Sequence, residues 1–151
     1  MRNTTHPAAR VEADISGVND LRVGPFSFIS STATVHDRCE IGAHAFVGER
    51  ATLSPGTSVG NYSEIREDCS VGTGTSIGSR VTLAAGTVVG NRCVIKYGFV
   101  ATDTPDLSSN NQKLACVIED GVLIGANVTL LPGLSVGEGA LSGLAPKSST
   151  R

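Results

Sequence analysis

The sequence predicts an all-β fold in which short parallel strands wind into a solenoid, a parallel β-helix. Three observations support this prediction: aliphatic residues recur every six positions, small or apolar residues recur four positions later, and turn-forming residues recur between them. A period of six is neither helical nor a simple alternation, but a short strand, a turn and a short strand fit it. Three such hexads would complete one triangular coil, so residues 18 apart should stack about 4.8 Å from each other.

The aliphatic repeat marks positions that should point into the β-helix. It runs through thirteen hexads without a gap and resumes in a new phase after one interruption. The positions are Val23, Ile29, Val35, Ile41, Val47, Leu53, Val59, Ile65, Val71, Ile77, Leu83, Val89 and Ile95, then Ile118, Ile124, Leu130 and Val136. The first residue after an aliphatic is often glycine, and the third is often glycine, asparagine or aspartate. Such residues tolerate the cramped or left-handed backbone of a corner.

The cysteines occupy the second set of inward positions, four residues after the aliphatic ones. Cys39, Cys69 and Cys93 belong to this set, and Cys116 joins it when the later phase is extended back by one hexad. We therefore expect four buried, reduced thiols. A thiolate zinc site is not expected, because the chain has no CxxC and no paired Cys/His spacing.

A single domain is expected for the 151 residues. It divides into an irregular N-terminal cap (1–22), coils (23–100), an extruded loop (101–111), final coils (112–140) and a tail (141–151). A net charge of −2 without a basic stripe argues against nucleic acid or an anionic membrane as a partner. The sequence has no apolar run of membrane-spanning length and no signal-peptide pattern at its start, so the cytoplasm is the expected location.

The segment from Ile118 to Gly143 reads IEDGVLIGANVTLLPGLSVGEGALSG. It resembles a block of the CoA-dependent sugar acetyltransferases in the hexapeptide-repeat acyltransferase superfamily, whose fold is a left-handed parallel β-helix. The resemblance covers residues 23–140. It implies a homotrimer with active sites between subunits, and acetyl-CoA as co-substrate, its pantetheine arm lying along the last coils. The matching positions are Gly125, Ala126, Asn127, Gly133 and Gly143, with Lys147 or Arg151 near the CoA phosphates.

The role of residues 118–143 in binding CoA and the role of the last residues in binding its phosphates each have a structural alternative. Any hexad with a glycine at its corner resembles the matched block, and the last residues would equally suit an irregular tail.

The interruption lies between Ile95 and Ile118, which are 23 positions apart, so roughly ten residues near 101–111 must leave the coil. In sugar O-acetyltransferases of this superfamily a His-Asp pair stands near this point, whereas here Thr102 precedes Asp103. The segment Thr102-Asp-Thr-Pro105 partly matches the T-N-D-x-x-P loop of 3-amino-3,6-dideoxyhexose N-acetyltransferases. The resemblance implies an acceptor loop in which Thr102 and Pro105 contact the substrate.

The missing histidine favours an amine as acceptor. A hydroxyl needs a general base to become a competent nucleophile, whereas a neutral amine needs only a late proton acceptor. We therefore hypothesise acetylation of the amino group of a nucleotide-linked amino sugar, with Asp103 orienting the ammonium and receiving its proton. The alternative is that Asp103 only caps its own turn.

His36 and His44 are the other candidate catalytic bases, and they would serve sugar O-acetylation, the second function considered. Both should face outward, about three coils or 14 Å along the axis from the loop. His44 stacks in one column with Tyr62 and Arg80, which would hold a nucleotide base or diphosphate. A third possibility is a non-catalytic scaffold. The histidines do not supply three clustered ligands, so no metal site is expected.

Overall fold

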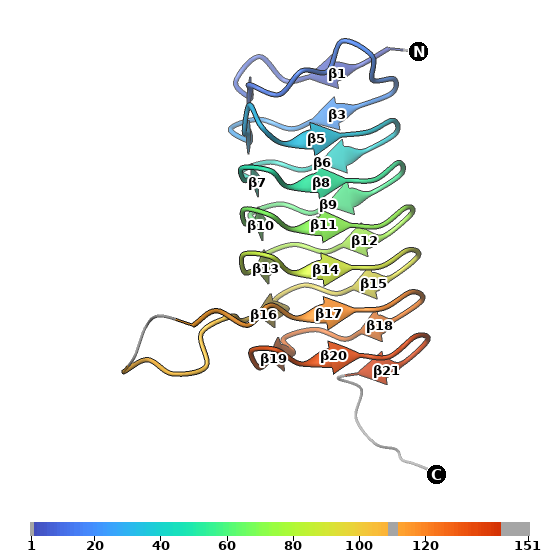
Figure 1. Ribbon diagram of the computed structural model, residues 1–151. Coiled ribbons are helices and arrows are strands. Elements are labelled where there is room, and N and C mark those ends of the chain that lie inside the picture. Colours follow the sequence, from blue (N-terminus) through green and yellow to red (C-terminus); the bar gives the residue numbers. More distant parts are fainter. Residues whose placement is uncertain (1, 109–111, 143–151) are drawn as a thin grey trace.

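The computed structural model describes residues 2–108 and 112–142. These residues form 21 strands of two residues each and no helix, and successive coils stack along one axis (Figure 1). The strands lie in three parallel sheets that run the length of the molecule. The predicted fold class, a left-handed parallel β-helix with one extruded loop, is confirmed. No helix in the described part of the chain has the length and apolar character to cross a membrane.

The first sheet contains eight strands: β1 (Thr4–Thr5), β3 (Arg22–Val23), β6 (Glu40–Ile41), β9 (Ser58–Val59), β12 (Ser76–Ile77), β15 (Val94–Ile95), β18 (Leu123–Ile124) and β21 (Leu141–Ser142). The second sheet contains seven: β2 (Arg10–Val11), β4 (Phe28–Ile29), β7 (Phe46–Val47), β10 (Glu64–Ile65), β13 (Thr82–Leu83), β16 (Val100–Ala101) and β19 (Thr129–Leu130). The third contains six: β5 (Thr34–Val35), β8 (Thr52–Leu53), β11 (Ser70–Val71), β14 (Val88–Val89), β17 (Val117–Ile118) and β20 (Ser135–Val136).

Three corners connect the sheets in every complete coil, and we name them by their contents. The aromatic corner joins the first sheet to the second and carries Phe26, His44 and Tyr62. The loop corner joins the second sheet to the third and contains the excursion. The remaining connection, from the third sheet back to the first, is the return corner. At most corners one residue has a positive φ, between 54° and 78°. Glycine fills only part of these positions, although other residues pay about 1–2 kcal/mol for this backbone conformation.

The core follows the predicted register. All thirteen aliphatic residues of the first phase are buried, as are Ile118 and Ile124, whereas Leu130 and Val136 in the last coil are half-buried. The four cysteines are buried and unpaired, as predicted. Hydroxyl groups that point inward are hydrogen-bonded to backbone carbonyls; Ser63, for example, donates to Gly78 over 2.7 Å. These bonds remove the penalty of burying a polar group.

Regular coils extend beyond three predicted boundaries. Within the predicted cap, β1 and β2 pair with β3 and β4, and within the predicted tail, β21 pairs with β18. Ala101, predicted to begin the loop, belongs to β16 and is 1% exposed. Short strands at these places follow the pairing of the neighbouring coil, although their own sequences interrupt the repeat.

The excursion projects sideways between β16 and β17 (Figure 1). Strand partners on either side of it, such as Val100 and Thr129, are 29 residues apart instead of 18, so it adds 11 residues to one coil. Its two ends meet at a neck, where the backbone N–H of Leu114 donates to the carbonyl of Asp103 over 2.8 Å. The coil that follows the excursion, beginning with β17, therefore pairs with the preceding coil without a change of register.

Candidate functional site

The three predicted catalytic residues lie at three different corners. Asp103 follows β16 at the loop corner, His44 lies between β6 and β7 at the aromatic corner, and His36 lies between β5 and β6 at the return corner. Both histidines are exposed, as predicted. Counting coils gives only the separation along the axis, but the three corners also point in different directions. Within one chain, neither histidine joins Asp103 in a single site.

The neck of the excursion forms a small polar cluster around Asp103, whose side chain is 20% exposed. Thr104 donates its hydroxyl hydrogen to Asp103 Oδ1 over 2.9 Å, and the Lys113 ammonium donates to the Thr104 hydroxyl over 2.9 Å. The same ammonium lies 4.0 Å from Asp103 Oδ1. The neck therefore already holds one cationic nitrogen beside the carboxylate.

Thr102 and Pro105, the two loop residues predicted to contact the substrate, differ in whether their side chains are free to do so. The Thr102 hydroxyl donates to the carbonyl of Leu130 over 2.8 Å, so its hydrogen joins the excursion to the next coil. Pro105 is exposed farther along the excursion. Only Pro105 therefore presents its side chain freely on the surface.

The predicted column at the aromatic corner is confirmed and is longer than expected. The rings of Phe26 and His44 stack with centroids 5.1 Å apart, and those of His44 and Tyr62 stack at 4.8 Å. The Arg80 guanidinium continues this column and lies 5.4 Å from the centroid of the Tyr62 ring. His44 is thus stacked on both faces, and Tyr62 has His44 and Arg80 as its neighbours. A nucleotide base has no free face to stack on at either residue, but the Tyr62 hydroxyl and Arg80 remain exposed at the edge.

The residues expected to bind CoA lie at two corners. Gly125, Ala126 and Asn127 follow β18 at the aromatic corner, whereas Gly133 follows β19 at the loop corner. A Cβ atom on Gly133 would lie 3.2 Å from Leu114 Cβ, so packing at the neck is itself a reason for this glycine. Gly143, Lys147 and Arg151 lie outside the described residues.

A small apolar hollow of about 190 Å³ lies beside the predicted CoA segment, where Gly125 is buried. Its lining consists of Val94, Lys96, Leu123, Ile124, Gly125 and Leu141. A larger and shallower groove of about 790 Å³ runs along the N-terminal half of the first sheet, past Arg22, Glu40 and Ser58. Lys96 and this groove were not singled out in the sequence. The sequence does contain a signal for the apolar hollow. The outward-facing residue of each strand in the first sheet is charged or polar up to β12, but it is Val94 in β15 and Leu123 in β18.

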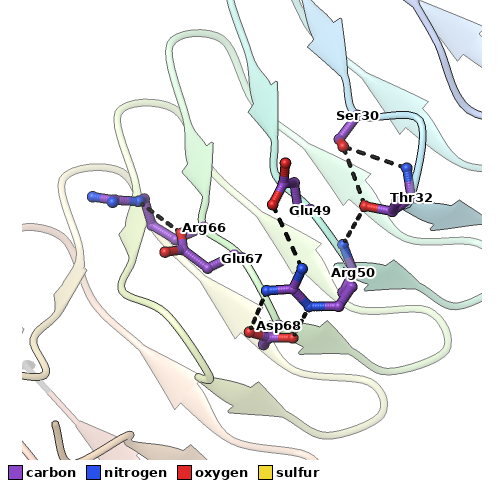
Figure 2. Close-up of polar contacts among 7 residues, drawn as sticks. All are labelled: Ser30, Thr32, Glu49, Arg50, Arg66, Glu67 and Asp68. Carbon is purple, nitrogen blue, oxygen red and sulfur yellow. Dashed lines mark hydrogen bonds and ion pairs between the residues drawn. The ribbon is translucent and has the colours of Figure 1, made fainter.

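A charged network at the loop corner was also missed (Figure 2). Arg50 binds Asp68 through two nitrogens, at 2.7 and 3.1 Å, and lies 3.5 Å from Glu49. The Arg50 guanidinium holds the pKa of the Asp68 carboxyl below its usual value. Arg66 pairs with Glu67 at 3.4 Å in the next coil. Arg50 and Asp68 are 18 positions apart, which is the sequence signal that identifies the pair.

Cys39 and Cys69 are not activated nucleophiles. Burial raises the pKa of Cys69 to about 11 and also raises the pKa of Cys39. Both side chains therefore stay protonated at neutral pH. Among the described residues, no group of three or more His, Cys, Asp or Glu side chains has the geometry to hold a metal ion.

The repeat in part of these coils matches a known family model. Residues 68–100 and 116–141 match the family described as the hexapeptide repeat of succinyl-transferase, so this part of the chain carries that family's repeat. No curated protein matches the sequence significantly.

Solved structures resemble the chain at low sequence identity. The polySia-specific acetyltransferase NeuO is 16% identical, with 94% of this chain and 74% of NeuO covered at a TM-score of 0.56. The polysialic acid O-acetyltransferase OatWY is 17% identical, with 93% and 72% covered at 0.52. These two structures share the fold of this chain.

A further similar structure is a mutant GDP-perosamine N-acetyltransferase from Caulobacter crescentus, in complex with CoA and GDP-perosamine. It is 23% identical, with 62% of this chain covered at a TM-score of 0.47. The match spans half the length of that enzyme.

Proposed function

We propose that the protein is an acetyl-CoA-dependent acyltransferase whose acceptor is the amino group of a nucleotide-linked amino sugar. The observation that carries the choice of acceptor is the neck of the excursion. There, Asp103 lies 4.0 Å from the Lys113 ammonium, with a threonine where a histidine base would stand. A carboxylate that already accommodates one ammonium suits an amine substrate, whereas a hydroxyl substrate would lack its base.

The donor would lie along the last coils, near Gly125, Ala126 and Asn127. The apolar hollow beside Gly125 supports this placement, because the pantetheine arm is a thin, extended chain with few charges. Lys96 at its edge would meet a phosphate group. The repeat family, named for succinyl-transferases, supports acyl transfer as the reaction class. Gly133, Gly143 and Lys147 belong to the same proposed donor site.

The chemistry is a direct transfer. The neutral amine attacks the thioester carbon, the carbon–sulfur bond then breaks, and CoA leaves as a thiolate that takes up a proton. The nitrogen loses its proton late, when it has become strongly acidic, and Asp103 is the acceptor of that proton. The products are an N-acetylated sugar and CoA. Pro105 would border the acceptor sugar, while the Tyr62 hydroxyl and Arg80 would contact its diphosphate.

A homotrimer belongs to this proposal, because only a neighbouring subunit would bring a second corner toward the loop corner. A cytoplasmic location remains a prediction from the sequence.

The test is the release of CoA thiol from acetyl-CoA in the presence of nucleotide-linked amino sugars. Asp103→Asn is expected to lower kcat for the amine about 100-fold, the lower end of the usual contribution of proton transfer. The matched control is Asp106→Asn in the same excursion, which should keep the wild-type rate. Unchanged turnover in Asp103→Asn would remove the assigned role, and equal binding of acetyl-CoA by both variants would show that their donor sites are intact.

O-acetylation through His36 or His44 is the second candidate, and a non-catalytic scaffold is the third. Acetylation of hydroxyl analogues alone, abolished by His36→Gln or His44→Gln, would favour the second. A folded protein without detectable acetyl-CoA binding would favour the third.

A further inference from the structure

A hollow of about 330 Å³ lies between the second sheet and the loop corner, near the N-terminal end of the β-helix. The rings of Phe28 and Phe46, which stack with centroids 5.6 Å apart, line its sheet side. Glu49 and Glu67 line its corner side. A Cβ atom on Gly48 would lie 3.1 Å from Phe46 Cε2, so this ring leans toward the corner. The hollow is therefore apolar on one side and negatively charged on the other.

The carboxylates at this hollow outnumber the arginines that pair with them. Three carboxylates border the hollow and two more share the same arginines; the carboxylates are Glu12, Glu49, Glu64, Glu67 and Asp68, and the arginines are Arg10, Arg50 and Arg66. Arg50 binds Asp68 through two nitrogens, so only its third nitrogen, at 3.5 Å, is near Glu49 (Figure 2). Five carboxylates and three arginines leave a surplus of two negative charges.

Glu49 and Glu67 are also stacked one above the other. They are 18 positions apart, which places them in adjacent coils at a spacing of about 4.8 Å. Like charges in such neighbouring positions repel each other. Their side chains are 68% and 41% exposed, so a partner can reach both of them. A cation bound between these two carboxylates would relieve the repulsion.

A buried hydroxyl adds a further polar group to the hollow. Ser30, which lines the hollow, is only 5% exposed. Its hydroxyl oxygen lies 3.4 Å from both the hydroxyl oxygen and the backbone nitrogen of Thr32. These separations are longer than those of strong hydrogen bonds, so the Ser30 oxygen can accept a hydrogen from a bound group.

We propose that this hollow binds a lysine or arginine side chain from a basic segment of another protein. The apolar stem of such a side chain packs against the two phenylalanine rings, while its cationic head reaches Glu49 and Glu67. The surplus negative charge attracts a basic partner and disfavours an acidic one. A second copy of this chain has a net charge of −2, so it is not the complementary partner. This docking site is separate from the residues of the proposed donor and acceptor sites.

The test measures binding of fluorescein-labelled oligolysine and oligoarginine peptides to the full chain by fluorescence anisotropy. Wild type is expected to bind, and Glu49→Gln/Glu67→Gln about tenfold more weakly, because one exposed ion pair changes an affinity up to about fivefold. Arg50 and Arg66 keep Asp68 and Glu64 as partners in this variant, so its fold should be intact, as circular dichroism would show.

The matched control for charge is Glu119→Gln/Glu138→Gln. It removes the same two charges from a hollow on the third sheet that has no aromatic ring in its lining. This variant should bind the peptides as wild type does. An equal loss of binding in both double variants would overturn the proposal, because it would show attraction to net charge alone.

The apolar side of the hollow is tested by Phe46→Ser, which leaves every charge in place. It should weaken binding about fivefold, the effect of about 40 Å² of apolar surface left in water. Val88→Ser removes an exposed apolar side chain from the third sheet and should have no effect. No binding by wild type, or full binding by Phe46→Ser, would overturn the proposal. Two other occupants would also overturn it: a small cation, if spermidine displaced the peptides at a matched amine concentration, and a second copy, if Phe46→Ser lowered the mass measured by light scattering.

Discussion

The aromatic corner and the loop corner share one backbone geometry but differ in their side chains. Both have a left-handed residue in successive coils: His44, Tyr62 and Arg80 at the first corner, Arg50 and Asp68 at the second. At the loop corner the stacked residues are an arginine and an aspartate, which neutralise each other within the chain. At the aromatic corner the rings of Phe26, His44 and Tyr62 stack face to face, with Arg80 over the last ring, and the ring edges are left in water.

The repeat therefore determines the backbone, whereas the side chains of the outward columns can differ from one corner to another. Inward positions must fit a narrow core, so their chemistry varies little. Outward side chains contact solvent, residues 18 positions away and close sequence neighbours, so one column can form an ion-pair network and another a stack of aromatic rings. Three predictions test this separation between backbone and columns.

The largest effect is expected from Gly60→Ala, two residues before the left-handed Tyr62 at the aromatic corner. A Cβ atom there would lie 2.5 to 2.6 Å from backbone atoms of Gly78 and Ser79, which cannot rotate away. Such overpacking should lower the free energy of unfolding by about 3 kcal/mol, as measured by urea denaturation. Gly137→Ala is the matched control, because a Cβ atom there has no neighbour within 4 Å. Equal stability of the two variants would show that the stacked corners are less rigid than described.

A smaller effect is expected at the loop corner from Thr102→Val, which removes the hydroxyl that donates to Leu130. Losing this bond at the neck should cost about 1 kcal/mol in the free energy of unfolding. Thr129→Val makes the same change on an exposed outward position of β19, and it should be nearly neutral. A neutral Thr102→Val would indicate that the backbone bond of Leu114 alone holds the neck together.

The smallest effect concerns pH. Arg50 lowers the pKa of Asp68 below its usual 3.8, so the folded state is stabilised by the ionised carboxylate. This contribution should be present at neutral pH and should disappear as the pH falls below about 4 toward the lowered value. The urea midpoints of wild type and Asp68→Asn should therefore differ slightly at pH 7, less in high salt, and converge in acid. A difference that grows on acidification would contradict this assignment.

The fold could be predicted almost completely from the sequence, because the core repeats a fixed physical requirement every six residues. Isolated exceptions such as Ala101 were missed, since strand pairing with the next coil extends a strand beyond its own pattern. The column of His44, Tyr62 and Arg80 could be predicted from the 18-residue spacing alone. Phe26 is one more step along the same spacing.

The candidate site was harder to predict. A separation along the axis follows from counting coils, but the directions of Asp103, His36 and His44 depend on which corner each occupies. Lys113 was not identified, because it returns to Asp103 from the far end of the excursion, ten positions away in a segment without a repeat. Such contacts depend on how a loop closes, and no periodicity reports that closure.

The central claim is acetyl transfer to an amino group, and the most direct measurement compares two matched acceptors. The protein would be incubated with acetyl-CoA and either a nucleotide-linked amino sugar or the same molecule with a hydroxyl in place of the amine, and CoA thiol release would be followed. The account predicts release with the amine and no release above background with the hydroxyl analogue. Release with the hydroxyl analogue alone would contradict it.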